Sequence, residues 1–133
     1  MPRAIAAAVA AIMVAGTAQA ADKRAIAAAE KVSEAAFLLV GVTYLCSDAV
    51  GNAHYHAARM MAEAAIKGLG TTDDEAVIHV DDFAARAKRE NPVKAPAENA
   101  SKCMDAILQG QSNLKVSQAR FRNIISDLEA SGK

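Results

Sequence analysis

Cys46 and Cys103 are the only cysteines in the 133-residue sequence, and their thiols could form a disulfide, a metal site or a redox centre. A metal or redox site usually needs a second cysteine close by in the sequence, and neither residue has one. A disulfide needs only an oxidising compartment in which the two thiols meet. If the chain is exported, we therefore expect one disulfide between them. In the chain-entropy model, a bridge that closes a loop of this length adds about 4 kcal/mol of stability.

The N-terminus predicts that the chain is exported. A basic residue near the start precedes Ala4–Gly16, which is apolar and uncharged, and Ala18–Ala20 has small residues at both positions that a signal peptidase reads. The apolar run is too short to span a membrane, which takes about 20 apolar residues. We expect a signal peptide over residues 1–20, cleaved after Ala20, and a single periplasmic or secreted domain over residues 21–133.

The stretch GLGTTDDEAVIHVDD, residues 68–82, holds five carboxylates and one histidine. It could begin a helix, respond to pH or bind a cation. Thr72 and Glu75 have the spacing of a capping box, in which each side chain accepts a hydrogen bond from the other residue's backbone N–H. A calcium loop would also need a carboxylate from a distant segment. We therefore predict a capped helix start here and no bound cation.

Glu75, His79 and Asp82 are the candidates for a response to pH. His79 should border the apolar face of its helix with a carboxylate on either side, and Asp82 can form an ion pair with Arg86 one turn later. Carboxylates that are ionised and paired in the fold stabilise it at neutral pH, and acid removes that contribution. In strong acid the basic residues stay positive, and their repulsion loosens the fold while a disulfide keeps its parts tethered.

The segment HYHAARMM, residues 54–61, contains histidines and methionines that could ligate copper. On a helix His54 and His56 point in nearly opposite directions, whereas His56 shares a face with Met60 and His54 shares one with Met61. Two ligands do not make a specific copper site. We interpret His54 as a hydrogen-bonded core residue and both methionines as core filler. No metal and no cofactor are expected, and a periplasmic copper binder is the least favoured alternative.

The alanine-rich composition and the spacing of apolar residues predict an all-α domain, a small bundle of four to five helices. The expected elements are a helix over Asp22–Leu45, with a short strand over Val40–Leu45 as the alternative; a helix over Ser47–Lys67, ended by Gly68 and Gly70; a helix over Thr72–Glu90; a linker over Asn91–Pro96; a short helix with Cys103–Leu108, broken by Gly110; and a last helix capped by Ser112.

Apolar stripes should turn three of these helices toward a core. On the second helix the stripe is Cys46, Val50, Ala53, Ala57, Met61 and Ala64. On the third it is Ala76, Val80, Phe83 and Ala87, with Val77 and Ala84 alongside. On the last it is Leu114, Phe121, Ile124, Ile125 and Leu128. Ile78 lies off the stripe of its helix and should stay exposed.

Charge balance and residue types argue against several classes of function. Acidic and basic residues number 15 each, whereas binding to nucleic acid or to an anionic membrane favours a basic excess. No arrangement of serines, histidines and carboxylates resembles a catalytic triad or a nucleophile elbow. A small alanine-rich helical domain also leaves little room for a deep cleft. We expect a protein that is not an enzyme, does not insert into a membrane and binds other proteins.

Three short motifs follow one another along the chain. Cys46-Ser47-Asp48 has an acid two residues after the cysteine, the run Asp74–Val80 follows a helix with a small-residue face, and Cys103 comes last. In these features the chain resembles the HdeA/HdeB family of periplasmic acid-stress chaperones. The resemblance implies a homodimer at neutral pH that dissociates and partly unfolds in acid, exposing apolar surface that holds unfolding clients. The residues that would bind clients are Val50, Met61, Val77, Val80 and Phe83.

An alternative function needs no response to acid. The chain could be a periplasmic helical interaction protein with a fixed partner in the envelope or in a secretion system. It would bind that partner through an exposed apolar face around Ile78. A chaperone of the first kind exposes apolar surface only in acid, whereas a partner-binding protein keeps its fold and its binding face at all pH values.

Overall fold

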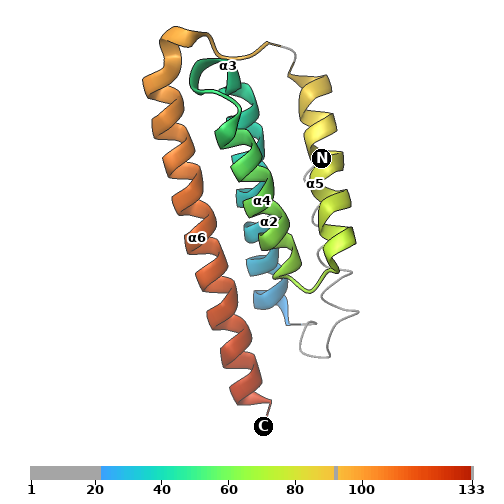
Figure 1. The fold of residues 1–133 in the computed structure, drawn as a ribbon. Helices are drawn as coiled ribbons and strands as arrows, with labels where there is room; N and C mark the ends of the chain where they lie inside the picture. Colours follow the sequence, from blue (N-terminus) through green and yellow to red (C-terminus); the bar gives the residue numbers. More distant parts are fainter. Residues whose placement is uncertain (1–21, 92, 133) are drawn as a thin grey trace.

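The fold, drawn in Figure 1, is known from a computed structural model that describes residues 22–91 and 93–132. The described chain forms five α-helices and one 3₁₀-helix, without a strand: α2 (Lys23–Leu45), α3 (Ser47–Val50), α4 (Ala53–Lys67), α5 (Asp73–Glu90), η2 (Ala97–Asn99) and α6 (Ala100–Ser131). Cys46 and Cys103 form a disulfide. The predicted all-α fold with one disulfide is therefore confirmed, while the predicted signal peptide lies outside the described residues.

α2 occupies the range predicted for the first helix. The Asp22 carboxylate caps its start by accepting a hydrogen bond from the backbone N–H of Arg24 at 2.7 Å, and this bond holds the pKa of Asp22 below its usual value. The alternative of a strand over Val40–Leu45 is wrong. The buried hydroxyl of Thr43 donates back to the carbonyl oxygen of Leu39 at 2.8 Å, so the helix satisfies this polar group without any sheet partner.

The prediction of one continuous helix over Ser47–Lys67 is wrong, because the chain leaves the helical conformation at Gly51 and Asn52. α3 ends at Val50, and Gly51 takes a φ of 92°, in the left-handed region that glycine enters freely and other residues avoid. The N–H of Gly51 donates to the carbonyl oxygen of Ser47 at 2.9 Å and closes this short helix. The chain then begins again at Ala53 as α4, which runs back along α2 (Figure 1).

The interruption changes which face of α4 is buried. The buried residues of this helix are Tyr55, Ala58, Ala62, Ala65 and Ile66. The predicted stripe is wrong at Ala53, Ala57 and Ala64, which are exposed. Val50 and Met61 are partly buried and pack against the core, as expected. The prediction assumed one helix that was continuous from the first cysteine, and the break between α3 and α4 rotates every later position.

The last two predicted helices are one continuous helix, α6, so the predicted break at Gly110 and the predicted cap at Ser112 are wrong. A Cβ placed on Gly110 would lie 3.1 Å from Cδ1 of Leu39, which means that this glycine lets α6 approach α2 closely. The predicted inner face is confirmed, since Leu114 and Phe121 are buried. Three further members of it are partly buried and pack against the core: Ile124, Ile125 and Leu128.

α2 is the central helix of the bundle. α6 and α4 both pack along it, and in Figure 1 α5 lies on the opposite side of α2 and α4 from α6. The Cys46–Cys103 disulfide joins the end of α2 to the first turn of α6. α6 is therefore attached covalently to α2, whereas α5 is held by noncovalent contacts with α4 and α2. This difference in attachment sets α5 apart from the other long helices.

Candidate functional site on helix α5

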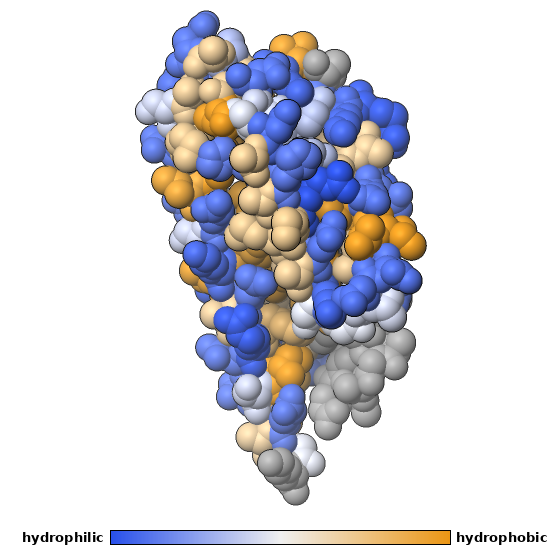
Figure 2. Space-filling view, in the orientation of Figure 1, coloured by the Kyte–Doolittle hydropathy of each residue, from blue (hydrophilic) through white to orange (hydrophobic). Residues whose placement is uncertain are grey.

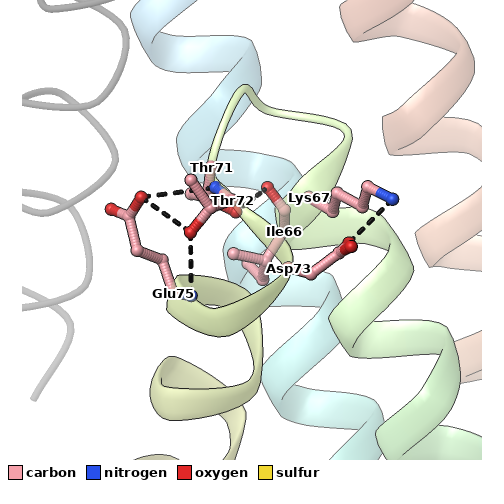
Figure 3. A network of polar contacts seen from close by, with 6 residues as sticks. All are labelled: Ile66, Lys67, Thr71, Thr72, Asp73 and Glu75. Carbon is pink, nitrogen blue, oxygen red and sulfur yellow. Dashed lines mark hydrogen bonds and ion pairs between the residues drawn. The ribbon is translucent and has the colours of Figure 1, made fainter.

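The start of α5 is held by the predicted capping box, drawn in Figure 3. Oγ1 of Thr72 accepts a hydrogen bond from the backbone N–H of Glu75 at 3.1 Å. In return, Oε1 of Glu75 accepts hydrogen bonds from the backbone N–H of Thr72 at 3.3 Å and from its hydroxyl at 3.0 Å. The two residues thus satisfy N–H groups that have no partner inside the helix. The Glu75 carboxylate has a defined role at this helix start.

Two ion pairs join α5 to α4, and each contains an aspartate of α5. Nζ of Lys67 lies 2.7 Å from Oδ1 of Asp73 (Figure 3), and Arg59 pairs with Asp81 further along the helix. Both aspartate side chains are more than half exposed to solvent. Pairs of this kind contribute roughly 0.2–1 kcal/mol each, because water and salt screen them. They favour the docked position of α5 without fixing it strongly.

The three candidates for a response to pH lie on α5 but do not contact one another through ion pairs or hydrogen bonds. His79 is half-buried at the edge of the apolar face, as predicted, while Glu75 and Asp82 are exposed. The predicted pair between Asp82 and Arg86 is wrong, since the ion pairs of residues 22–91 and 93–132 do not include it. Asp81 pairs across to α4 instead. The pH response of the three candidates stays a prediction.

The buried face of α5 consists mostly of small side chains. Its fully buried members are Ala76, Val80, Ala84 and Ala87. Phe83 is half-buried and stacks on Phe37 of α2, with ring centroids 4.7 Å apart. Gly41 of α2 lies beside this ring, and a Cβ there would make only an ordinary van der Waals contact with it, at 3.9 Å. Alanines bury little apolar surface, so the hydrophobic attachment of α5 depends chiefly on Val80 and Phe83.

An open groove of about 290 Å³ lies between α4 and α5. Its walls are formed by Met60, Glu63, Ala64, Lys67, Asp73, Ala76 and Val77. Met60 is 70% exposed and Val77 is 40% exposed, and neighbouring Ile78 is 57% exposed. Figure 2 shows hydrophobic side chains over α5 standing among hydrophilic ones. The groove therefore offers apolar surface with a charged rim while the protein is folded.

The six predicted binding residues differ in how accessible they are in the folded state. Ile78 is exposed, as predicted, but Val77 is exposed as well, so the prediction that Val77 turns toward the core is wrong. Both are accessible to a partner without unfolding. Val50, Met61 and Phe83 are partly buried, and Val80 is fully buried. Val80 and Phe83 could therefore meet a client only after α5 has moved away from the core.

The histidines and methionines of residues 54–61 are spread around α4. His54 is half-buried and its side chain makes no hydrogen bond within the described chain, so its interpretation as a hydrogen-bonded core residue is wrong. Met60 is exposed, so its interpretation as core filler is also wrong, whereas Met61 does pack against the core. Across residues 22–91 and 93–132, no three histidine, cysteine, aspartate or glutamate side chains come together in a way that could hold a metal ion.

A pair of tyrosines surrounded by basic side chains was not predicted from the sequence. Tyr55 meets Tyr44 edge to face, with ring centroids 5.9 Å apart. Arg59 and Lys88 lie 5.9 and 5.7 Å from the centre of the Tyr55 ring, and Lys94 lies 4.9 Å from the centre of the Tyr44 ring. Only the i,i+4 spacing of Tyr55 and Arg59 is visible in the sequence. Lys88 and Lys94 reach the tyrosines through the tertiary fold.

Comparisons of the chain with protein-family models, with curated proteins and with solved structures found no match. Among the described helices, none has the length and apolar character needed to cross a membrane. The function proposed below is therefore argued from the residues and their geometry.

Proposed function

We propose that the protein is an exported chaperone, activated by acid, that acts as the HdeA/HdeB proteins do. In this proposal α5 separates from α4 and α2 at low pH. The exposed surface then holds unfolding client proteins, and the neutral form is a closed homodimer. The observation that supports it best is the unequal attachment of the helices, since the Cys46–Cys103 disulfide joins α6 to α2, while no disulfide joins α5 to a neighbouring helix.

Acid weakens the attachment of α5 in two ways. It neutralises the aspartates of the Lys67–Asp73 and Arg59–Asp81 pairs, which leaves the basic partners facing no charge. It also leaves the whole chain strongly positive, and self-repulsion favours more open states. Each pair contributes little because it is exposed. The hydrophobic attachment of α5 is also small, so a modest loss of electrostatic attraction is enough to shift the equilibrium from docked to separated α5.

Separation of α5 would expose aromatic and aliphatic surface on both sides of the opening. Phe83 and Val80 would leave the core, and Phe37 of α2 would lose the ring that covers it. The disulfide would keep the two ends of the opened segment together, so that α5 could dock again when the pH rises. Such a cycle needs no catalytic residue and no cofactor.

The test follows the oxidised protein from neutral pH to about pH 2, below the range in which carboxylates titrate. Helix content, molecular mass and binding of an apolar dye are measured, together with suppression of client aggregation. We expect dye binding only in acid, a fall in mass, partial retention of helix and suppressed aggregation. Absence of dye binding in acid, or aggregation of clients at the same rate with and without the protein, would overturn the proposal.

A matched set of variants examines the role of the ion pairs. Combining Asp73→Asn with Asp81→Asn removes both pairs, so dye binding should begin at a higher pH than in the unaltered protein. Asp105→Asn combined with Asp127→Asn is the control, because it removes the same number of charges and both are exposed aspartates of α6 that take part in no ion pair of the described chain. An equal shift in the control would show that the total charge matters and the two pairs do not.

A second candidate function rests on the groove between α4 and α5. Met60 and Val77 are exposed along its walls in the folded protein, and Ile78, next to Val77 in the chain, is exposed as well. This apolar surface suits a fixed envelope or secretion-system partner. This function predicts that the protein stays folded and binds no apolar dye across the same pH range. Ile78→Asp would then abolish binding to the partner without changing the melting temperature.

A further inference from the structure

A pocket of about 210 Å³ opens at the end of the bundle where α2 ends and α4 begins. The residues that matter for its chemistry are Tyr44, Asn52, Tyr55, His56, Lys88 and Lys94. A single water molecule needs only on the order of 10 Å³, so the pocket has room for a small organic or inorganic ion. It is separate from the groove between α4 and α5, with which it shares no lining residue.

The walls of the pocket carry two lysines that are brought together by the tertiary fold. Lys88 is in the last turns of α5, and Lys94 is in the linker that follows it. A hydrogen bond from the backbone N–H of Ala95 to the carbonyl oxygen of Leu45, at 2.8 Å, holds this linker against α2. Lys94 lies 3.6 Å from a carboxylate oxygen of Asp48. Lys88 takes part in no ion pair of the described chain. The pocket therefore has more positive than negative charge on its walls.

The start of α4 adds hydrogen-bond donors at the same place. Asn52 precedes the helix, and its side chain makes no capping hydrogen bond. The first backbone bond of the helix runs from the His56 N–H to the Asn52 carbonyl oxygen at 3.0 Å. The N–H groups of residues 53–55 therefore have no partner within the described chain. Such free N–H groups, with the positive end of the helix dipole, are suited to binding an anion.

The aromatic wall contains a polar group without a partner. Tyr55 is 6% exposed, and its hydroxyl makes no hydrogen bond to any described residue. The rings of Tyr55 and Tyr44 lie under the two ammonium groups, at 5.7 and 4.9 Å from their centres. The ring faces favour the cations and hold them over the pocket. The two lysines and the aromatic floor thus line one small volume, and the start of α4 borders it through Asn52 and Tyr55.

We infer that this pocket binds a small oxyanion, a phosphate or carboxylate group, between Lys88, Lys94 and the first turn of α4. The ammonium groups neutralise the anion and the free N–H groups of α4 orient its oxygens. The two tyrosines exclude water from one side of it. This inference does not depend on the acid-activated function, because the pocket is formed by the folded protein.

The experiment titrates inorganic phosphate, and separately succinate, into the oxidised protein at neutral pH and constant ionic strength. Amide chemical shifts are followed by NMR. We expect saturable shifts confined to residues 53–55 and to the surroundings of the two lysines. Lys88→Gln and Lys94→Gln should each weaken binding by about tenfold or more, because each removes a charge-assisted contact. A response to phosphate alone or to succinate alone supports the site and identifies the group that it prefers.

Lys115→Gln is the matched control, since Lys115 is an exposed lysine of α6 away from the pocket. It should leave the affinity unchanged, and thermal melts of all three variants should show that the fold is intact. Shifts that spread over the surface without saturating would overturn the inference. So would an equal loss of affinity in Lys115→Gln, because binding would then reflect the overall charge of the protein.

Discussion

Val80→Ala and Val32→Ala form a matched pair that tests whether α5 opens independently of the bundle. Both valines are buried, with exposed fractions of 0% and 1%. Val80 lies on the inner face of α5. Val32 precedes Leu39 of α2 by seven residues and so lies on the same side of that helix. Leu39 faces Gly110 of α6, which places Val32 on the side of α2 toward α6.

The two substitutions should cost similar amounts of stability. Each removes two methyl groups from a buried position, worth about 0.8 kcal/mol apiece, or about 1.6 kcal/mol of transfer free energy. The space left unfilled adds to this, which brings the total to about 2 kcal/mol. A change of that size alters an opening equilibrium by about 30-fold.

The assay is native-state hydrogen exchange at neutral pH, resolved helix by helix. If α5 opens by itself, the contacts of Val32 remain intact in the open state. Val80→Ala should then speed the exchange of α5 amides by about 30-fold, while Val32→Ala leaves them unchanged. Val32→Ala should instead speed the exchange of those amides of α2 and α6 that open only when the whole bundle unfolds.

One result would refute this reasoning about α5. If Val32→Ala speeds the exchange of α5 amides as much as Val80→Ala does, α5 unfolds together with the rest of the bundle. There would then be no partly open state for acid to favour, and the proposed chaperone cycle would lose its mechanism.

Four further predictions concern the parts that hold the bundle together. Replacing Cys46 and Cys103 together by serine should lower the free energy of unfolding by about 4 kcal/mol in urea titrations, given the 57-residue separation, and an unchanged midpoint would contradict the proposed role of the bridge. Thr72→Ala should cost about 1 kcal/mol of stability, with increased exchange in the first turn of α5, because it removes the capping hydroxyl. Asp22→Ala should fray the start of α2 at neutral pH. Since the pKa of Asp22 is lowered in the fold, its contribution to the stability of the helix start is present above about pH 4 and is lost as the pH falls through the lowered value. NMR should therefore find that the helix start of the variant and that of the unaltered protein become alike in acid. Gly110→Leu should lower stability by about 1–3 kcal/mol through overpacking between α6 and α2, and an unchanged melting temperature would show that the helices can move apart freely.

Local sequence signals predicted α5 well because the forces that define its ends are local. Gly70, with a φ of 107°, ends the turn after α4, and the Thr72–Glu75 capping box begins the new helix. The spacing of Ala76 and Val80 correctly indicated the buried face. Each of these interactions joins residues a few positions apart, so their pattern is visible without knowledge of the tertiary fold.

The face of α4 could not be predicted because it depends on a break that the pattern did not reveal. Helical spacing favoured Ala53, Ala57 and Ala64 as inner residues, on the assumption that the helix continues from the first cysteine. Gly51 adopts a backbone conformation that ends α3 and starts α4 in a different phase. Tyr55 then takes the inner position, where it contributes more buried apolar surface than any alanine would.

At Gly110 the prediction was wrong in the opposite way. This glycine was expected to end a helix, but it lies inside α6 and allows close packing. In an isolated helix glycine is unfavourable by about 1 kcal/mol relative to alanine, which is why it was expected to end one. In the folded protein, Cδ1 of Leu39 packs against Gly110, and a Cβ on this residue would lie only 3.1 Å from it. Close packing of α6 on α2 offsets the local cost, and the helix continues. Gly51 and Gly110 are the same residue type with opposite effects. Gly51 has a positive φ and no neighbouring atom near the place of a Cβ, whereas Gly110 is helical and packs against Leu39.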